Sequence, residues 1–296
     1  MDGILNINKP IGNTSFSIVA MVKRLTRERR VGHAGTLDPI ASGVLPVCFG
    51  QGTRVIEFLQ DARKIYRTQI SLGVATDSYD ATGKIVWQGE YKKISQRHVE
   101  RALSSFSGLI WQTPPMYSAL KYQGKRLYQL ARAGIMVNRA SRPARIHRCE
   151  LIGFQPPLIT VEIECGKGTY IRSLTHDLGK LLGCGAHIKE LTRLSYGPFN
   201  IEEAVSMIRL EDALSSHDFQ HLVYPIDSVM NNWSIVVVGD EQERIIKNGG
   251  SIVIQRKPTD SNGEKRCCAY SKNGNFLAVL FFNAERGYWH PDKVFV

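Results

Sequence analysis

The stretch from Arg30 to Gly43, RVGHAGTLDPIASG, holds residue types that could do chemistry. It contains three glycines, one histidine and a single acid, Asp38, and it runs directly into the apolar segment VLPVCF. Glycine lets a backbone adopt positive φ or pass close to another molecule, and catalytic residues are often carried on loops that rigid elements hold in place. The stretch is therefore a candidate functional loop, and Asp38 is its only acid.

A simpler explanation of Asp38 is that it begins a helix, because Asp at the N-cap and Pro at the first helical position are both common. Gly43 and Pro46 follow within two turns, however, so a helix that began at Pro39 would be very short. His33 alone is most often a satisfied polar residue, but it lies five residues before the only acid of the loop. The sequence favours a functional loop that ends in a buried strand.

Hydrophobic patterns predict the elements around this loop. Apolar residues at i, i+3, i+4 and i+7 indicate one buried face of a helix, and alternation indicates a half-buried strand. We expect strands at 4–8, from 65 onward, at 84–88 in a hairpin and at 158–165. We expect one helix that is capped by Ser15 or Ser17 and a second that is capped by Ser95. A third helix should bury the face formed by Ile171, Leu174, Leu178 and Leu181. Tyr66 falls on the less polar face of its strand, and Arg172 falls in the first turn of its helix, off the core face.

Positive charge is concentrated in two segments. The 296-residue chain has a net charge of +11, and a basic surface attracts polyanions. Residues 23–30, KRLTRERR, bring five cations to the start of the Asp38 loop, although a helix end also favours cations for its dipole. Residues 119–148 contain eight Lys or Arg and no acid, with tyrosines among or beside them, a pattern that suits phosphate neutralisation and base stacking. We interpret residues 114–148, approximately, as an RNA-gripping arm.

The remaining composition excludes several classes of protein. No apolar run is long enough to span a membrane, and the N-terminus has no signal-peptide pattern, so we expect a cytoplasmic protein without a membrane partner. The six cysteines show no CxxC spacing, and the pair His217 and His221 lacks the glutamate of a zinc-protease helix. We expect reduced thiols, no metal and no cofactor.

The last part of the chain has a different character. From Trp233 onward, strand patterns at 233–238 and 250–254 surround a short helix at 241–247, and Asn273-Gly274 indicates a hairpin. This segment holds nine Lys or Arg and seven Asp or Glu, a net of +2, which leaves +9 of the +11 in the first 232 residues. We expect a small β-rich domain that is an accessory contact and not the main electrostatic one.

Residues 32–54, GHAGTLDPIASGVLPVCFGQGTR, resemble the signature of the TruB family of pseudouridine synthases, whose loop carries the catalytic aspartate in a GHxGTLDPxAxGVLP pattern. Further matches follow in the family's order: INKPIGNTS at 7–15, KIYR at 64–67, TDSYDATG at 76–83, PPMYSALKYQGKRLYQLAR at 114–132 and GKGTYIRSLTHDLG at 166–179. The match continues with Gly185-Ala186-His187 and then with Leu191, Arg193 and Leu194. The resemblance covers at least the first two hundred residues. It implies an α+β pseudouridine synthase fold over residues 1–231, with a mixed, largely antiparallel sheet flanked by helices, and residues 232–296 are similar in pattern to the PUA RNA-binding module.

The resemblance also implies roles for single residues. Asp38 would be catalytic, Arg172 would pair with it, and Tyr66 would stack on the target base. Four further residues would contact the substrate: Tyr170 against the nucleotide, Leu191 in the base pocket, His33 in the space left by the flipped base, and Arg54, where many relatives have Lys, at a phosphate. The implied reaction is isomerisation of uridine 55 in the T arm of tRNA, by a monomer acting without guide RNA, metal or cofactor.

This chemistry leaves the target of Asp38 open. The carboxylate could attack the ribose C1′ or the uracil ring, and a glycal could form after loss of a ribose proton. Arg172 would hold Asp38 ionised and oriented by a charge-assisted bond, and Tyr66 is the best candidate for proton transfer. The base must first be flipped, at a cost of roughly a few kcal/mol.

Two alternatives belong to other functional classes. One is a non-catalytic RNA-binding protein or tRNA-folding chaperone, but binding alone does not require the set of Asp38, Tyr66 and Arg172. The other is a relative that works in a guide-RNA complex, but the chain shows none of the extra tails of that branch.

Overall fold

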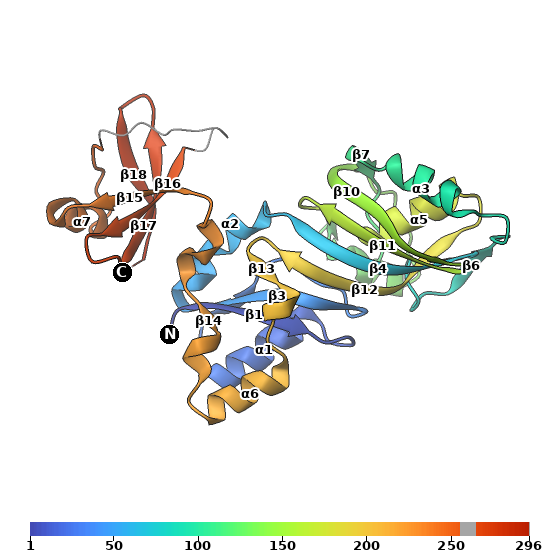
Figure 1. Ribbon diagram of the computed structural model, residues 1–296, viewed down its shortest axis with the longest axis horizontal. Coiled ribbons are helices and arrows are strands. Elements are labelled where there is room, and N and C mark those ends of the chain that lie inside the picture. The colour runs from blue at the N-terminus through green and yellow to red at the C-terminus, as the bar shows by residue number, and fades with distance from the viewer. Residues whose placement is uncertain (255–264, 296) are drawn as a thin grey trace.

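The computed structural model describes residues 1–254 and 265–295, and a ten-stranded sheet forms its centre (Figure 1). The strand order is β14-β1-β3-β12-β4-β11-β10-β7, while β2 pairs with β3 and β13 pairs with β12. Their bounds are β1 Gly3–Lys9, β2 Val31–His33, β3 Ala41–Phe49, β4 Lys64–Leu72, β7 Gly108–Gln112, β10 Arg142–Gln155, β11 Leu158–Cys165, β12 Ala186–Tyr196, β13 Phe199–Asn200 and β14 Val223–Tyr224. All these pairings are antiparallel except that of β12 with β3, so the expected mixed, largely antiparallel sheet is confirmed.

Helices cover the sheet at two places (Figure 1). Helices α1 (Ser15–Thr26) and α6 (Met207–Ser215) pack together beside β1. Helices α3 (Gln96–Ser104) and α5 (Ile171–Leu181) pack on the other half of the sheet, against β10 and β12. The shorter elements are α2 Ile56–Gln60, the pair β5 Val74–Thr76 and β6 Ile85–Gln88, and the 3-10 helices η1 Gly50–Val55, η2 Ile201–Glu203, η3 Phe219–Leu222 and η4 Ile226–Met230. No helix of the described residues is long and apolar enough to cross a membrane.

The alternating sequence patterns predicted the buried faces of the strands correctly. In β11 the apolar set Ile159, Val161, Ile163 and Cys165 is buried, and in β4 the face that carries Tyr66 is buried along its whole length. The predicted strand at 84–88 is present as β6 and forms its hairpin with β5. Asp38 begins no helix, because Pro39 and Ile40 form a turn that leads directly into β3.

Three details of the helices differ from the prediction. The N-cap of α1 is Thr14, whose hydroxyl accepts a hydrogen bond from the Ser17 amide, so neither Ser15 nor Ser17 is the cap. Leu181 is 58% exposed, because the buried face of α5 ends one turn earlier at Leu178. Arg172, expected off the core face, is instead buried.

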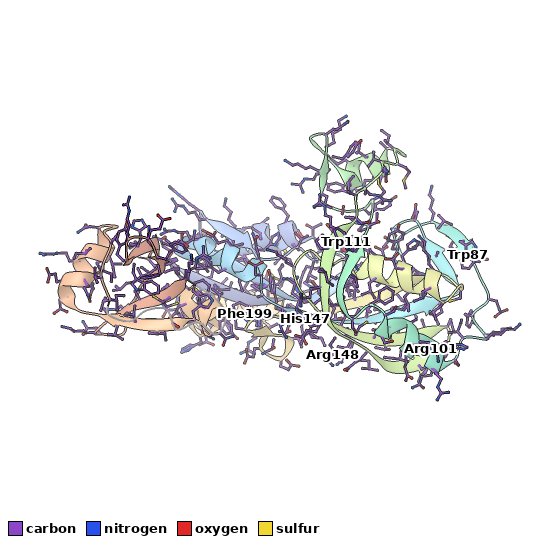
Figure 2. All side chains as sticks on the ribbon, turned by 90° about the horizontal axis from the view of Figure 1, so that it is seen from above. Trp87, Arg101, Trp111, His147, Arg148 and Phe199 are labelled. Carbon is purple, nitrogen blue, oxygen red and sulfur yellow. The ribbon has the colours of Figure 1, made fainter. Side chains whose placement is uncertain are left out.

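The basic segment divides between an arm and the sheet. The arm leaves the end of β7 and returns at β10, and it contains the hairpin of β8 (Lys121–Tyr122) and β9 (Lys125–Arg126) and the helix α4 (Leu127–Arg132). It stands out from the rest of the molecule above Trp111 (Figure 2). Arg142, Arg145 and Arg148 lie in β10 itself, and Arg148 pairs with glutamates of the same sheet face. The projecting arm is therefore shorter than residues 114–148.

The C-terminal segment forms a separate four-stranded sheet in the order β15-β16-β17-β18, with α7 (Asp240–Lys247) beside it (Figure 1). Its strands are β15 Ser234–Val238, β16 Arg266–Ser271, β17 Phe276–Asn283 and β18 Tyr288–Val294. The predicted Asn-Gly hairpin joins β16 to β17, whereas the strand expected at 250–254 is reduced to one bridge between Ile252 and Trp289. Residues 255–264 of the predicted domain lie outside the described part of the chain.

The C-terminal sheet packs directly on the first domain. Val279 and Phe295 belong to the same apolar cluster as Ile4 and Phe199 of the large sheet. This shared core, which also includes Val55 of η1, fixes the position of the C-terminal sheet next to β1 and η1.

Candidate active site

The loop that carries Asp38 connects β2 to β3 and is held by the start of α1. The Ser15 hydroxyl donates to the Leu37 carbonyl oxygen (3.1 Å) and accepts from the Leu37 amide (2.8 Å), which fixes the residue before Asp38. The Gly12 amide donates to the Pro39 carbonyl oxygen at 2.8 Å. The loop is therefore held on both sides of Asp38, by the Ser15 hydroxyl at Leu37 and by the Gly12 amide at Pro39.

Gly35 makes this loop possible through its backbone conformation. Its φ is +66°, and a Cβ at this position would lie 2.7 Å from the Tyr196 ring. A larger residue would be strained and would also collide with the ring.

Arg172 forms an ion pair with Asp38, with 2.8 Å between Nη2 and Oδ2. The Arg172 side chain is 4% exposed and that of Asp38 is 36% exposed, so a buried cation orients a carboxylate that still faces solvent. Nη2 also donates to the Tyr117 carbonyl oxygen at 2.8 Å, and Nη1 lies 3.8 Å from Oδ2 of buried Asp80. The arginine thus connects the Asp38 loop, the start of the arm and the 76–83 segment.

Tyr66 lies in β4 with its ring buried and its hydroxyl on the side of Arg193. The two residues are direct cross-strand partners, and Arg193 Nη1 donates to the Tyr66 hydroxyl oxygen at 3.4 Å. Burial raises the pKa of Tyr66, while the neighbouring guanidinium acts in the opposite direction. Tyr66 is therefore a neutral phenol beside a cation at neutral pH.

Three further predicted residues lie around Asp38 and Tyr66. Leu191 is buried in β12, opposite Ala41 on one side and Thr68 on the other. Tyr170 is the N-cap of α5, and its pKa is raised by burial and, more weakly, by the charge of Asp38. His33 ends β2, and no described residue accepts or donates a hydrogen bond at its buried Nδ1. Burial and the charge of Arg193 lower the pKa of His33, which makes it a neutral imidazole at neutral pH.

Arg54 is the one predicted residue that the structure places elsewhere. Its Nη1 donates to the Val294 carbonyl oxygen at 2.5 Å and to the Gln51 side chain at 3.1 Å. Its guanidinium lies 5.1 Å from the centre of the Phe295 ring. Arg54 therefore contacts the C-terminal sheet and not the residues around Asp38.

Two buried cations near the site were missed by the sequence reasoning. Lys9 is fully buried, and its Nζ donates to the carbonyl oxygens of Pro10 and Asn13, both at 2.8 Å. Burial lowers the pKa of Lys9 to about 8, against the opposing effect of Asp38. Arg193 is also fully buried. A cation in a sequence normally indicates a surface position, so only membership in the matched motifs could have drawn attention to these two.

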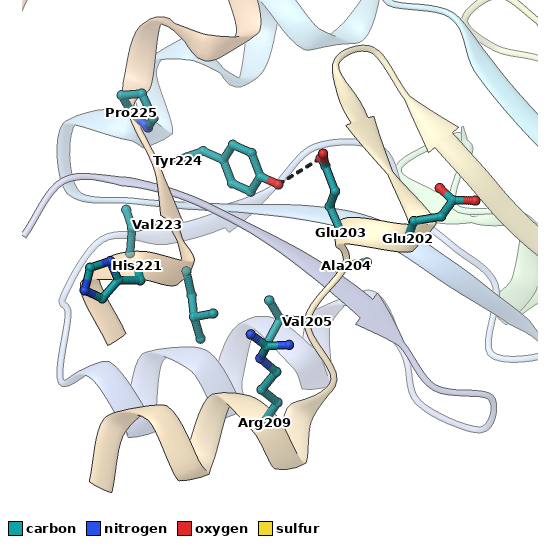
Figure 3. A pocket seen from close by; sticks show the side chains of 10 residues that line it. Glu202, Glu203, Ala204, Val205, Arg209, His221, Val223, Tyr224 and Pro225 are labelled. Carbon is teal, nitrogen blue, oxygen red and sulfur yellow. Dashed lines mark hydrogen bonds between the residues drawn. The ribbon is translucent and has the colours of Figure 1, made fainter. Parts of the chain in front are cut away.

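The described residues include no group of three or more His, Cys, Asp or Glu that could hold a metal ion. A groove of about 300 Å³ lies elsewhere, between the start of α6 and β14 (Figure 3). Its walls include Glu203, whose carboxylate accepts a hydrogen bond from the Tyr224 hydroxyl at 3.0 Å, and Arg209. None of the predicted site residues lines it.

Two family models match consecutive parts of the sequence. The TruB family pseudouridylate synthase N-terminal domain matches residues 23–171, and the tRNA pseudouridylate synthase B C-terminal domain matches residues 172–231. The chain belongs to the TruB family of pseudouridylate synthases. It is therefore an enzyme, a pseudouridine synthase, as the loop motif predicted.

Relatives within the TruB family match almost the whole chain. The tRNA pseudouridine synthase B of Dehalococcoides mccartyi is 43% identical over 298 residues, which cover 100% of this chain and 97% of that protein. The protein of the same name from Clostridium acetobutylicum is 41% identical over 279 residues, or 94% of this chain and 95% of that protein.

Solved structures share the fold. A chain in the crystal structure of a Cbf5-Nop10-Gar1 complex gives a TM-score of 0.77 at 24% identity, over 99% of this chain and 85% of that chain. A structure of an H/ACA RNP bound to a substrate RNA containing 2'-deoxyuridine gives 0.74 at 22% identity, again over 99% and 85%. These similarities confirm the α+β fold of this TruB family member.

Proposed function

We propose that this chain isomerises uridine 55 in the T arm of tRNA to pseudouridine, alone and without a guide RNA. The observation that carries the proposal is the Asp38–Arg172 ion pair at 2.8 Å, with the carboxylate open to solvent and the cation buried. The curated relatives named tRNA pseudouridine synthase B, which match nearly the full chain, support tRNA as the substrate. The cytoplasm, where tRNA is modified, is the proposed place of action.

The reaction breaks the bond between N1 and C1′ and joins C5 to C1′. Asp38 is the proposed nucleophile, either at C1′ or at the uracil ring, and a glycal path through loss of a ribose proton uses the same carboxylate. Arg172 holds the carboxylate by a charge-assisted bond, which stabilises its ionised form. Because Arg172 is buried and also bonded to the Tyr117 carbonyl oxygen, the Asp38 side chain has little freedom to rotate away.

Protons must also move during the isomerisation. Uracil C5 loses one proton and N1 gains one, so a single group that gives one proton and receives the other returns to its starting state. Tyr66 is the proposed group, because its hydroxyl is buried close to Asp38 and accepts a bond from Arg193. Its ring would stack on the base, with Leu191 on the pocket wall and Tyr170 against the nucleotide.

The target base must leave the RNA stack to reach this site. His33, half-buried at the end of β2 and neutral because of burial, is proposed to fill the space that the base leaves. The arm carries cations and tyrosines on a projecting segment, which suits contacts with phosphates and bases of an RNA stem-loop.

The C-terminal sheet is proposed to be a PUA-like RNA-binding module. Its net charge is small, so it would add a contact and not the main attraction for RNA. Arg54 would support that contact indirectly, by its bond to the Val294 carbonyl oxygen, or would bind a phosphate directly, as the family resemblance implies.

The test uses a T-arm transcript tritiated at uracil C5 and the purified chain alone, which we expect to act as a monomer. The parent protein should release tritium and Asp38→Asn should not. Asp61→Asn is the matched control, because Asp61 is a 73% exposed acid that pairs only with Lys167 among the described residues. If the parent and Asp38→Asn both bind the RNA tightly and neither releases label, the non-catalytic RNA-binding function replaces the proposal.

A further inference from the structure

Arg193 is a fully buried cation without a carboxylate partner among the described residues. Its three nitrogens are each used: Nε donates to the Val44 carbonyl oxygen at 2.7 Å, Nη2 to the Gly35 carbonyl oxygen at 3.0 Å, and Nη1 to the Tyr66 hydroxyl at 3.4 Å. Removing a charge from water is costly, and buried charges are usually paired with an opposite charge. An arginine that is buried here against neutral groups therefore needs an explanation.

The position of Arg193 connects the two parts of the site. Gly35 precedes Asp38 and Val44 follows it, so two of the three bonds hold the ends of the Asp38 loop. The third bond goes to Tyr66 in β4. Arg193 itself is in β12, which lies between β3 and β4, where it pairs in register with Gly43 and Tyr66.

The direction of the hydrogen bond matters for Tyr66. A guanidinium has only donors, so the Tyr66 oxygen must accept the bond and its own proton points elsewhere. The adjacent cation also stabilises negative charge on that oxygen, in opposition to burial. Both effects make the Tyr66 proton easier to transfer toward a base held near Asp38.

We propose that Arg193 is a positioning residue for the reaction, which holds the Tyr66 hydroxyl and the Asp38 loop in one fixed arrangement and stabilises the phenol oxygen while its proton is shared. This inference rests on the proposed function, in which Tyr66 moves the proton. It assigns to Arg193 an effect on the chemical step and not on the binding of RNA, because the buried guanidinium is not exposed to a ligand.

A purely structural role is the competing explanation, and Lys64 provides a control for it. Lys64 is also buried, its Nζ donates to the carbonyl oxygens of Gln60 and Ala62, and it lies 4.2 Å from the centre of the Tyr196 ring, as the Arg193 guanidinium does at 4.9 Å. Within the described part of the chain, the hydrogen bonds of Lys64 Nζ go to neither the Tyr66 hydroxyl nor the Asp38 loop. A variant of Lys64 therefore reports the loss of a buried cation alone.

The test measures single-turnover tritium release, with enzyme in excess, for Arg193→Lys, Tyr66→Phe and the double variant. Arg193→Lys should lower the single-turnover rate by roughly 10- to 100-fold relative to the parent, because that factor corresponds to the loss of one hydrogen bond to a charged group. The Kd for a non-reacting T-arm RNA should change by less than about twofold. In the Tyr66→Phe background the same substitution should cost less than about threefold, because the two residues act together. Lys64→Met should lower the melting temperature and leave the rate within about threefold.

Equal losses from Arg193→Lys in the two backgrounds, or a loss as large from Lys64→Met, would overturn the inference in favour of a structural role. If Tyr66→Phe is too slow to measure, the pH dependence of the rate decides. Without the cation beside it, the Tyr66 hydroxyl should lose its proton at higher pH, so Arg193→Gln should move the alkaline limb of the pH–rate profile to higher pH. An unchanged alkaline limb overturns the inference. A parent protein that releases no tritium at all would instead refute the proposed function, so the two failures are distinguishable.

Discussion

Replacing Arg172 with methionine tests the central ion pair. The substitution keeps much of the side-chain volume but leaves Asp38 and Asp80 without their cation. Removing one partner of a buried ion pair costs about 3–5 kcal/mol. Asp38 is 36% exposed and can be solvated, whereas the Asp80 side chain is only 6% exposed, so most of the cost should arise at Asp80.

We expect Arg172→Met to lower the free energy of unfolding by about 3 kcal/mol, toward the low end of that range. The rate of tritium release should fall by roughly 10- to 100-fold, because the lost charge-assisted bond to Asp38 is worth about 1.5–3 kcal/mol and each 1.36 kcal/mol, roughly, is a factor of ten in rate. Denaturant unfolding and single-turnover release measure the two effects separately. Arg172→Lys should recover part of the stability but little of the rate, because one lysine nitrogen cannot replace both Nη2, at Asp38 and the Tyr117 carbonyl oxygen, and Nη1, at the Ser78 carbonyl oxygen and Asp80.

The double variant Arg172→Met/Asp80→Asn separates stability from catalysis. Neutralising Asp80 removes the buried uncompensated charge, so stability should return while the rate stays low. A rate that recovers together with stability would refute the reasoning, because Arg172 would then act by neutralising Asp80 and not by holding Asp38.

Three further predictions follow from buried or strained positions. Burial lowers the pKa of Lys64 from 10.5 to about 8, so the unfolded chain binds more protons than the folded chain between these pH values. As the pH rises from 8 to 10.5, the free energy of unfolding of the parent should therefore increase by on the order of 3 kcal/mol relative to that of Lys64→Met, measured by denaturant unfolding. Gly43→Ala should cost at least about 3 kcal/mol, because φ is +101° and a Cβ would overlap the Arg193 backbone, whereas Gly274→Ala, with positive φ but open space, should cost only about 1 kcal/mol in the same measurement. Arg54→Gln should lower the stability by about 1–2 kcal/mol through the lost bond to the Val294 carbonyl oxygen; a reduced salt dependence of T-arm binding would show instead that Arg54 contacts a phosphate.

Local patterns predicted most of the sheet correctly. Alternation in β4 and β11 reports directly which side chains face the core, because successive strand residues point to opposite faces. The position of Asp38 in a loop was predicted from its neighbours, since Gly43 and Pro46 leave no length for a helix. The strand pairing itself, above all the parallel pairing of β12 with β3, depends on contacts between distant segments, and no local pattern contains them.

Charged residues were the main source of error. The sequence pattern placed three arginines of β10 in the arm, because the exposed face of a strand can carry the same cations as a projecting loop: Arg142, Arg145 and Arg148. Arg172 was expected outside the buried face, and Arg193 received no role, because the sequence does not show which carbonyl and carboxylate oxygens surround a buried cation. Those oxygens come from segments up to 158 residues away in the chain.

The place of β12 in the sheet has a consequence for the order in which the enzyme is built. Asp38 precedes a strand of the group β14-β1-β3, Tyr66 lies in the group β4-β11-β10-β7, and β12 alone joins these two groups within the described sheet. Since β12 ends at Tyr196, a nascent chain already carries both residues long before it can align them. Closing such long loops is slow compared with forming local hairpins. We therefore expect Asp38 and Tyr66 to be aligned late in synthesis, once β12 has left the ribosome and can pair with β3 on one side and β4 on the other.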